Sequence, residues 1–179
     1  MKQTDPRPMR ELIKKTALRT LELEARSVEG LRSSITDEFV KAVEALASTK
    51  GRVVISGIGK SAVIAQKMVA TFNSTGTPSI FMHAADAIHG DLGMIQQNDI
   101  VVILSKSGES PEIKVLVQLI KNFGNIIIAI VGNTKSFLAS QSSLILDTTV
   151  EQEACPNNLA PTSSTTAQLV MGDMLAIDR

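Results

Sequence analysis

The segment "ISGIGKS" places two glycines, a lysine and a serine directly after an apolar run. Such a turn offers backbone N–H groups, a helix N-terminus and an ammonium group, which together bind an anion. A Walker A loop for nucleoside triphosphates would need a glycine where Val54 stands, so the spacing argues against that class. We therefore expect Gly57, Gly59, Lys60 and Ser61 to bind a monophosphate or a sugar hydroxyl. The alternative is a purely structural turn with a solvated lysine.

The same glycines also fit the looser G-x-G-x-x-A pattern of dinucleotide-binding folds. That pattern needs an acidic residue at the end of the second strand to hold a ribose. The second predicted strand ends in His83 instead. We therefore expect no nicotinamide cofactor, and no other cofactor is predicted.

The segment "SKSGES" is the second candidate for chemistry. It supplies hydroxyls at Ser105, Ser107 and Ser110, and Gly108 between them frees the backbone. Neutral donors at this spacing can converge on one tetrahedral anion. The alternative is an ordinary serine-rich turn in which one serine caps the following helix.

Alternating apolar runs and helical patterns predict the elements that position these segments. From about residue 8 to residue 50 the spacing predicts two helices, the second capped near Thr36. Strands are then predicted at Arg52–Ser56, Ser79–His83, Ile100–Ser105, Asn125–Val131 and Ser143–Leu146. Helices are predicted at Lys60–Asn73, Ala84–His89, Pro111–Asn122 and Thr162–Ala176, with a short one before the fifth strand and "GDLGMIQQND" as a loop.

This alternation predicts a mostly parallel five-stranded α/β sheet covered on both faces. In such sheets ligands bind beyond the carboxyl ends of the strands, where the strand order reverses. With the order 2-1-3-4-5, "GIGKS" and "SKSGES" would both lie at that point. We expect residues 1–50 to form a helical extension and residues 51–179 to form the α/β domain.

Composition narrows the classes of function. The chain has 179 residues, a formal net charge of +0, five Phe and neither Tyr nor Trp, which disfavours nucleic acid as a partner. Cys155 is the only cysteine, which is typical of a reducing compartment. No run is apolar enough to span a membrane, so we expect a cytoplasmic protein without a membrane partner.

These segments together resemble the sugar isomerase (SIS) domain family, whose S-x-S-G-x-S signature matches "SKSGES". Within that family, "GIGKS", "STGTPSIFMHAADAIHGDLGMI", "SKSGESPEI" and "EACPNNLAPTSSTTAQLVMGD" are similar to bacterial D-arabinose 5-phosphate isomerases. The resemblance runs from about Lys50 to Leu175. It implies a flavodoxin-like three-layer α-β-α sandwich.

The resemblance also implies a reaction. Proteins of this kind are aldose–ketose isomerases that interconvert D-ribulose 5-phosphate and D-arabinose 5-phosphate through an enediol or enediolate. Their product feeds the eight-carbon acid sugar Kdo of lipopolysaccharide and some capsules. The reaction needs a proton-transferring group and a group that stabilises the developing oxyanion.

The resemblance implies four catalytic residues: Lys60, Glu112, Glu153 and His89. Taken alone, Glu112 would be an ordinary acidic residue in the first turn of a helix. Glu153 would be one of two solvated carboxylates in a loop. His89 is also implied at the substrate.

Further substrate contacts are implied at Gly76, Thr77, Thr162, Ser163 and Ser164. His83 matches a position of inhibitory zinc binding, with a hydrogen-bonded loop histidine as an equal alternative. The family also implies a homo-oligomer, a tetramer, and the apolar N-terminal helices independently call for a partner surface.

The sequence departs from the family in three places. It reads "GKSAV" where the family has "GKSGH", so one imidazole is missing. Paired CBS domains are not expected here. The family's histidine in an "SHPGG"-type segment would fall after Arg179. Two alternatives therefore stay open: a phosphosugar-binding regulatory module without efficient turnover, and an isomerase of another phosphosugar.

Overall fold

Five apolar segments form one parallel sheet in the computed structural model, which describes residues 6–177, with side chains from Met9 onward. The strand order is β2-β1-β3-β4-β5, and all four pairings are parallel. The strands are β1 (Val53–Gly57), β2 (Ser79–His83), β3 (Ile100–Ser105), β4 (Ile126–Val131) and β5 (Leu144–Asp147). This is the order that the sequence analysis assumed in placing the two candidate segments, and the predicted fold class is confirmed.

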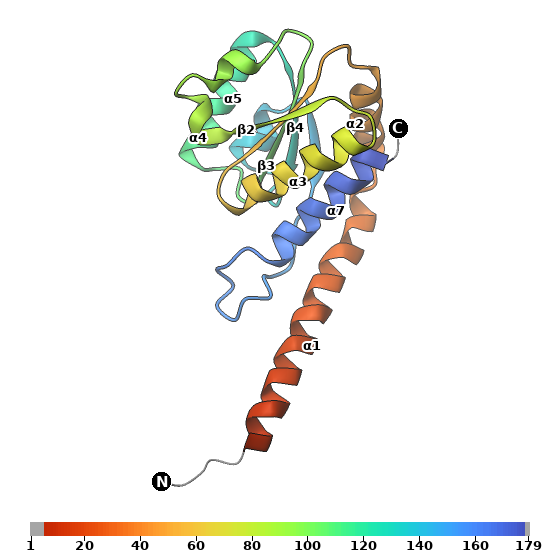
Figure 1. The fold of residues 1–179 in the computed structure, drawn as a ribbon, viewed down its shortest axis with the longest axis vertical. Helices are drawn as coiled ribbons and strands as arrows, with labels where there is room; N and C mark the ends of the chain where they lie inside the picture. Colours follow the sequence, from red (N-terminus) through yellow and green to blue (C-terminus); the bar gives the residue numbers. More distant parts are fainter. Residues whose placement is uncertain (1–5, 178–179) are drawn as a thin grey trace.

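Helices cover both faces of the sheet and give three layers (Figure 1). One face packs against α2 (Asp37–Ser48), α3 (Lys60–Ser74) and α7 (Ser163–Ile177). The other face packs against α4 (Ala84–Ala87), α5 (Pro111–Phe123) and α6 (Phe137–Gln141). Alternate residues of each strand enter opposite cores, which explains the uninterrupted apolar runs: Val53 and Ile55 face α3, whereas Val54 faces α5.

Local sequence signals place the helix ends. Thr36 caps α2, because its hydroxyl accepts a hydrogen bond from the Glu38 N–H at 3.3 Å. Pro111 lies in the first turn of α5, where its missing N–H costs nothing. Gly124 ends that helix in the left-handed conformation, with φ of 78°.

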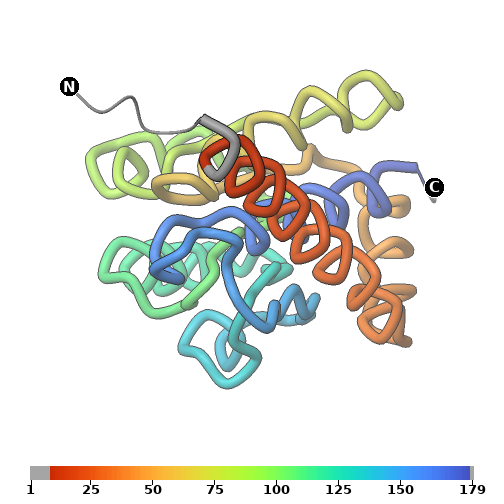
Figure 2. The backbone as a smooth tube through the Cα atoms, turned by 90° about the horizontal axis from the view of Figure 1, so that it is seen from below, coloured from red at the N-terminus to blue at the C-terminus, as the bar shows by residue number. Residues whose placement is uncertain are grey.

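The first helix, α1 (Pro6–Gly30), extends away from the sheet like an arm (Figure 1). It packs across α7, as the view in Figure 2 shows, and a 3-10 turn, η1 (Leu31–Ser34), joins it to α2. Leu23 is buried there. Five large apolar side chains of the helix remain more than half exposed: Met9, Leu12, Ile13, Leu18 and Leu21.

Most predicted strand and helix bounds lie within one residue of the observed ones, and two details differ by more. The segment predicted as a loop after His89 contains a 3-10 turn, η2 (Asp91–Met94). The helix predicted to reach His89 ends at Ala87, because the His89 N–H already closes a turn on Asp86 O at 2.9 Å. No helix within residues 6–177 is both long enough and apolar enough to cross a bilayer.

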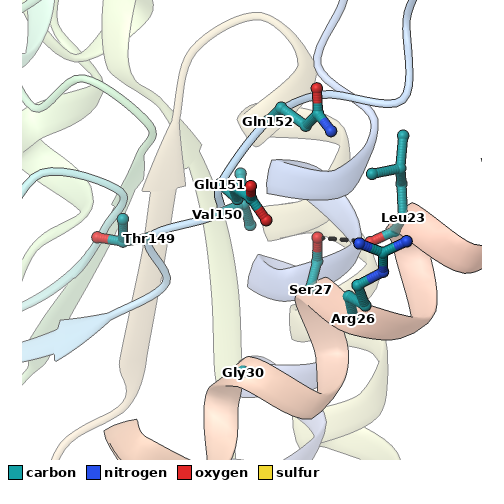
Figure 3. Close-up of a pocket in the computed structure, with 8 residues that line it drawn as sticks. All are labelled: Leu23, Arg26, Ser27, Gly30, Thr149, Val150, Glu151 and Gln152. Carbon is teal, nitrogen blue, oxygen red and sulfur yellow. Dashed lines mark hydrogen bonds between the residues drawn. The ribbon is translucent and has the colours of Figure 1, made fainter.

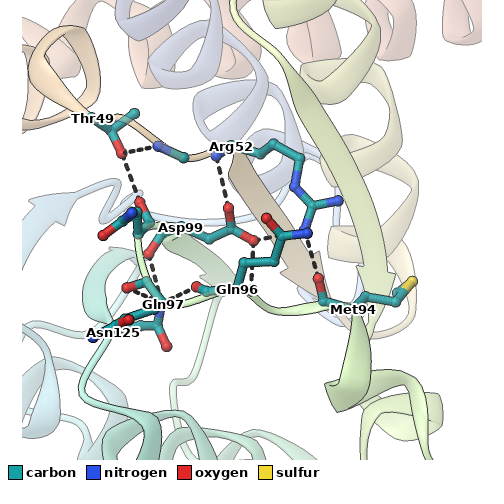
Figure 4. A network of polar contacts seen from close by, with 9 residues as sticks. Thr49, Arg52, Met94, Gln96, Gln97, Asp99 and Asn125 are labelled. Carbon is teal, nitrogen blue, oxygen red and sulfur yellow. Dashed lines mark hydrogen bonds and ion pairs between the residues drawn. The ribbon is translucent and has the colours of Figure 1, made fainter.

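A buried carboxylate closes the amino edge of the sheet (Figure 4). Asp99 Oδ2 accepts from Arg52 Nη2 at 2.8 Å and from the Gln96 N–H at 2.9 Å, while its Oδ1 accepts from the Arg52 N–H at 2.8 Å. Burial alone would raise the pKa of Asp99, but these bonds and the Arg52 charge hold the pKa below its usual value. Asn125 donates to the Asp99 carbonyl at 2.8 Å and ties in the next strand.

We predict that Asp99→Ala lowers the free energy of unfolding by about 2–3 kcal/mol, since it leaves two N–H groups and a guanidinium without their acceptor. Urea unfolding at pH 7 measures this. Asp91→Ala, at an exposed position in η2, is the control and should stay within about 0.5 kcal/mol of the parent chain. Equal stability of the two variants would contradict the role given to Asp99.

Candidate active site

A cavity of about 260 Å³ opens at the carboxyl edge of the sheet, at the reversal of strand order between β1 and β3. This places it where parallel α/β sheets bind ligands. Both predicted segments line it, together with residues just before and within α7. Its lining residues are Ile58, Lys60, Ser61, Ser105, Lys106, Ser107, Ser110, Pro161 and Ser164. The sequence prediction that "GIGKS" and "SKSGES" meet is therefore confirmed.

Three helices begin at this cavity. Lys60 is the first residue of α3, Ser110 precedes α5, and Ser164 is the second residue of α7. Neither α3 nor α5 has a side-chain cap on its first N–H groups. The Ser110 hydroxyl is buried and has no hydrogen-bond partner among the described residues. The first N–H groups of α3 and α5 and the Ser110 hydroxyl can therefore donate hydrogen bonds to a ligand.

The glycines of "GIGKS" shape the turn rather than line the cavity. A Cβ on Gly57 would lie 3.0 Å from the Ser61 carbonyl carbon and 3.1 Å from the Ala62 nitrogen, so the strand can approach α3 only without a side chain. Gly59 has φ of 58°, a conformation that favours glycine. Ser61, which follows, donates from its hydroxyl to Gln168 Oε1 of α7 at 3.1 Å.

The serine loop is held by internal bonds and by close packing. Ser105 Oγ accepts from the Gly108 N–H at 3.0 Å, and Ser107 Oγ accepts from the Glu109 N–H at 3.2 Å. Gly108 has φ of 65°, and a Cβ there would lie 2.1 Å from Ser136 Oγ. The glycine is thus required twice, by its backbone conformation and by the neighbouring loop.

Lys106, which lines the cavity, forms an ion pair with Glu153. Lys106 Nζ donates to Glu153 Oε1 at 2.6 Å, with the lysine side chain 44% exposed and the carboxylate fully buried. Glu153 Oε2 accepts from the Thr162 N–H at 2.8 Å and the Ser164 N–H at 3.1 Å. The carboxylate therefore caps the N-terminus of α7, where the helix dipole favours negative charge.

These contacts fix the charge of Glu153. Burial raises the pKa of the carboxyl, but the Lys106 ammonium and the N–H groups of Thr162 and Ser164 outweigh it and lower the pKa to about 2. A carboxylate with so low a pKa is a weak base near neutral pH. Its geometry suits holding a cation and a helix end.

Four other predicted residues, Glu112, His89, Thr162 and Ser163, do not line the cavity. Glu112 is the second residue of α5 and is partly exposed, two positions after the cavity-lining Ser110. His89 is exposed in the segment after β2. Thr162 precedes α7, and Ser163 begins it with a buried hydroxyl that has no partner among the described residues.

Gly76 and Thr77 lie elsewhere in the chain. They precede β2 and line a separate cavity of about 330 Å³ at the amino edge of the sheet, with Thr49 and Gly51. A single chain does not bring them to the cavity of the serine loop. Their substrate contact stays a prediction.

His83 ends β2 and its Nδ1 is 3.8 Å from Asp86 Oδ2, too far for a hydrogen bond. Its ring meets Phe81 edge to face at 6.2 Å. Within residues 6–177, no three His, Cys, Asp or Glu side chains are grouped to hold a metal ion. The zinc site at His83 stays a prediction.

A third cavity, of about 160 Å³, lies between α1 and the segment after β5 (Figure 3). It is lined by Leu23, Arg26, Ser27 and Gly30 on α1 and by residues 149–152, and it contains no predicted site residue. Nearby, Arg19 Nη1 donates to the Ala154 carbonyl at 3.2 Å. The arm thereby contacts the loop that carries Glu153.

Lys106 is the charged residue in the lining of this cavity to which sequence reasoning gave no role. It lies between Ser105 and Ser107, which were predicted to bind an anion. Its positive charge could have indicated that it binds the same anion. Its partner Glu153 lies 47 positions later, so the pair becomes visible only in the folded chain.

The model of the SIS domain family matches residues 45–178, and the chain belongs to that family. An arabinose 5-phosphate isomerase of Pseudomonas aeruginosa, KdsD, is 53% identical over 162 residues, covering 90% of this chain and 50% of the relative. An arabinose 5-phosphate isomerase of Escherichia coli, KpsF, is 46% identical over 159 residues, covering 88% of this chain and 50% of the relative. The chain spans about half the length of these curated relatives.

A solved structure is also similar. A protein of Escherichia coli CFT073, determined in complex with arabinose 5-phosphate, superposes with a TM-score of 0.89 at 39% identity. The match covers 98% of this chain and 91% of that one. The family match, the similar solved structure and the position of the cavity in the sheet are therefore consistent with one another.

We predict that Glu153 gives the chain an acid-sensitive part of its stability. The folded pKa is about 2 against an ordinary 4.5, so this contribution is complete above about pH 5 and is lost as pH falls toward 2, with a full size of about 3 kcal/mol. Urea unfolding of the parent chain and of Glu153→Gln between pH 7 and pH 3 measures it. The difference between the two should shrink as pH falls.

Glu151→Gln is the matched control, because Glu151 is exposed and two positions away. It should track the parent chain at every pH. A difference between the parent chain and Glu153→Gln that is constant from pH 7 to pH 3 would contradict the prediction.

Proposed function

We propose that the chain is the isomerase domain of an arabinose 5-phosphate isomerase, which interconverts D-ribulose 5-phosphate and D-arabinose 5-phosphate. The names of the relatives and the sugar phosphate bound in the similar structure support this substrate. The observation that carries the proposal is the cavity between "GIGKS" and "SKSGES", where donors and positive charge converge.

The charge of the cavity suits a phosphate monoester. Two lysines, Lys60 and Lys106, line it, and Glu153 behind them offsets one positive charge. The two helix N-termini without a side-chain cap, those of α3 and α5, add about half a charge each. The sum is roughly +2, which matches the charge of about −1.5 to −2 on a phosphate monoester at pH 7.

The volume also favours a small polar ligand. About 260 Å³ is below the roughly 300–1,000 Å³ typical of pockets for larger organic ligands. Five of the nine lining residues are serines and two are lysines, so the cavity offers hydroxyl and ammonium donors to the oxygen atoms of a ligand.

The chemistry follows from a phosphate held at the serine loop. A base removes the proton from the carbon beside the carbonyl, and the electron pair forms an enediolate between the two carbons. The isomerisation is complete when a proton returns to the former carbonyl carbon and a second proton moves from the neighbouring hydroxyl oxygen to the former carbonyl oxygen. A nearby cation stabilises the oxyanion while it exists. Lys60 supplies such a cation inside the cavity.

The proton-transferring role falls to Glu112 or His89 by resemblance. Support for Glu112 is its place in the first turn of α5, beside the cavity-lining Ser110. The buried Glu153 is ionised and saturated with donors, so we assign it to holding the site. The product would serve the synthesis of Kdo for lipopolysaccharide or capsule, and we infer a cytoplasmic location from the single cysteine.

We predict that Lys60→Ala and Glu112→Gln each lower kcat/KM for arabinose 5-phosphate by roughly 100-fold or more, because they remove oxyanion stabilisation and proton transfer. Ribulose 5-phosphate formation in a coupled assay measures this. Lys41→Ala, an exposed position on α2, is the control and should keep the parent activity.

A panel of pentose and hexose phosphates run on the same sample decides between the alternatives. Preference for another phosphosugar would replace the substrate, and tight binding by calorimetry without turnover would support a regulatory module. A folded chain with neither binding nor turnover would contradict the proposal.

We also propose a homo-oligomer, a tetramer by resemblance, assembled through the apolar side chains that α1 exposes. The double variant Leu12→Glu/Leu21→Glu should lower the mass measured by light scattering at micromolar concentration. Lys135→Glu, at an exposed position outside α1, should leave the mass unchanged. A monomeric parent chain would contradict this proposal.

A further inference from the structure

Lys106 lines the cavity and is also held by an ion pair. It lines the cavity between Ser105 and Ser107, and its side chain is 44% exposed, so its ammonium can reach a ligand. At the same time its Nζ lies 2.6 Å from a carboxylate that is fully buried. A lysine on a flexible stem is thus held in one place.

The carboxylate that holds Lys106 cannot itself move toward a ligand. Glu153 Oε2 accepts from the Thr162 N–H at 2.8 Å, the Thr162 hydroxyl at 3.2 Å and the Ser164 N–H at 3.1 Å. Its own N–H donates to Asn158 Oδ1 at 2.7 Å. Because both its backbone and its side chain are hydrogen-bonded, Glu153 is held in a fixed position between α7 and Lys106.

We infer that Lys106 contacts the phosphate together with the serine loop and that Glu153 is the positioning residue that aims the Lys106 ammonium into the cavity. This inference rests on the proposed function for the identity of the phosphosugar, and on the cavity alone for the phosphate group. Lys106 belongs to the serine loop, which binds the phosphate in that proposal, whereas Lys60 approaches from α3. The two lysines therefore divide the ligand between them, with Lys106 serving binding and Lys60 serving the reacting carbons.

Neutralising Glu153 separates a positioning role from a purely electrostatic one. An ionised carboxylate near an anion weakens its binding, so a charge effect alone would make Glu153→Gln bind phosphate more tightly. If Glu153 aims Lys106, the same change releases the ammonium and weakens binding. The sign of the change is the readout.

We expect Lys106→Met to raise the Kd for inorganic phosphate, measured by calorimetry, and the KM for arabinose 5-phosphate by roughly 10-fold, the size of one charge-assisted contact, with kcat changed less than 3-fold. Glu153→Gln should weaken phosphate binding in the same direction. The double variant should be no weaker than Lys106→Met, because both changes remove one contact. Lys106→Arg, which keeps the charge, should recover part of the affinity.

Lys135→Met is the matched control, a lysine in the loop after β4 that does not line the cavity, and it should bind phosphate as the parent chain does. Thermal unfolding of each variant identifies loss of fold, and Lys106→Met, at an exposed side chain, tests the inference should Glu153→Gln not fold. Unchanged phosphate affinity in Lys106→Met, or tighter binding in a folded Glu153→Gln, overturns the inference.

Phosphate binding keeps this test apart from the proposed function. A chain without isomerase activity whose phosphate affinity falls in Lys106→Met supports the inference and contradicts the function. A chain with full activity whose KM and phosphate affinity do not change in Lys106→Met supports the function and contradicts the inference.

Discussion

Parallel pairing of all five strands is the constraint on which this molecule depends. Because each strand runs the same way, each chain segment that leaves a strand does so at the same edge, and the helices after β1 and β3 begin there. The positive ends of α3 and α5 therefore point toward one place, and the backbone alone produces a positive potential there. The serines and lysines add ligand specificity to the positive electrostatic field that the helix N-termini already provide.

The carboxyl edge and the amino edge of the sheet each have a buried carboxylate, and the two carboxylates have different roles. Asp99 satisfies Arg52 and two backbone N–H groups, and it joins the loops that precede the strands. Glu153 satisfies α7 and a lysine that remains half open to solvent. Asp99, whose donors all belong to the loops that it joins, stabilises the fold, whereas Glu153, which shares a donor with a cavity, also prepares a ligand site.

Much of the fold could be predicted from the sequence. The strands Ser79–His83 and Ile100–Ser105 were predicted with the observed bounds, because uninterrupted apolar runs between turn residues leave little else. The end of the helix after β2 was predicted two residues too late, since the turn at Asp86 depends on backbone bonds that residue types do not encode.

The candidate site was predictable in part. "GIGKS" and "SKSGES" meet as expected, because strand order alone brings them together. The role of Glu153 was not predictable from residue type, since its burial and its bond to Lys106 depend on how the loop after β5 folds back on α7. Gly76 and Thr77 were assigned to the substrate by resemblance, yet they stand at the opposite edge of the same chain.

The contact between Arg19 and the Ala154 carbonyl joins the arm to the loop that carries Glu153. Ala154 is the next residue after Glu153, so the position of α1 and the placement of the carboxylate belong to one equilibrium. The first helix thus reaches from the apolar side chains that it exposes to within one residue of the carboxylate that holds Lys106.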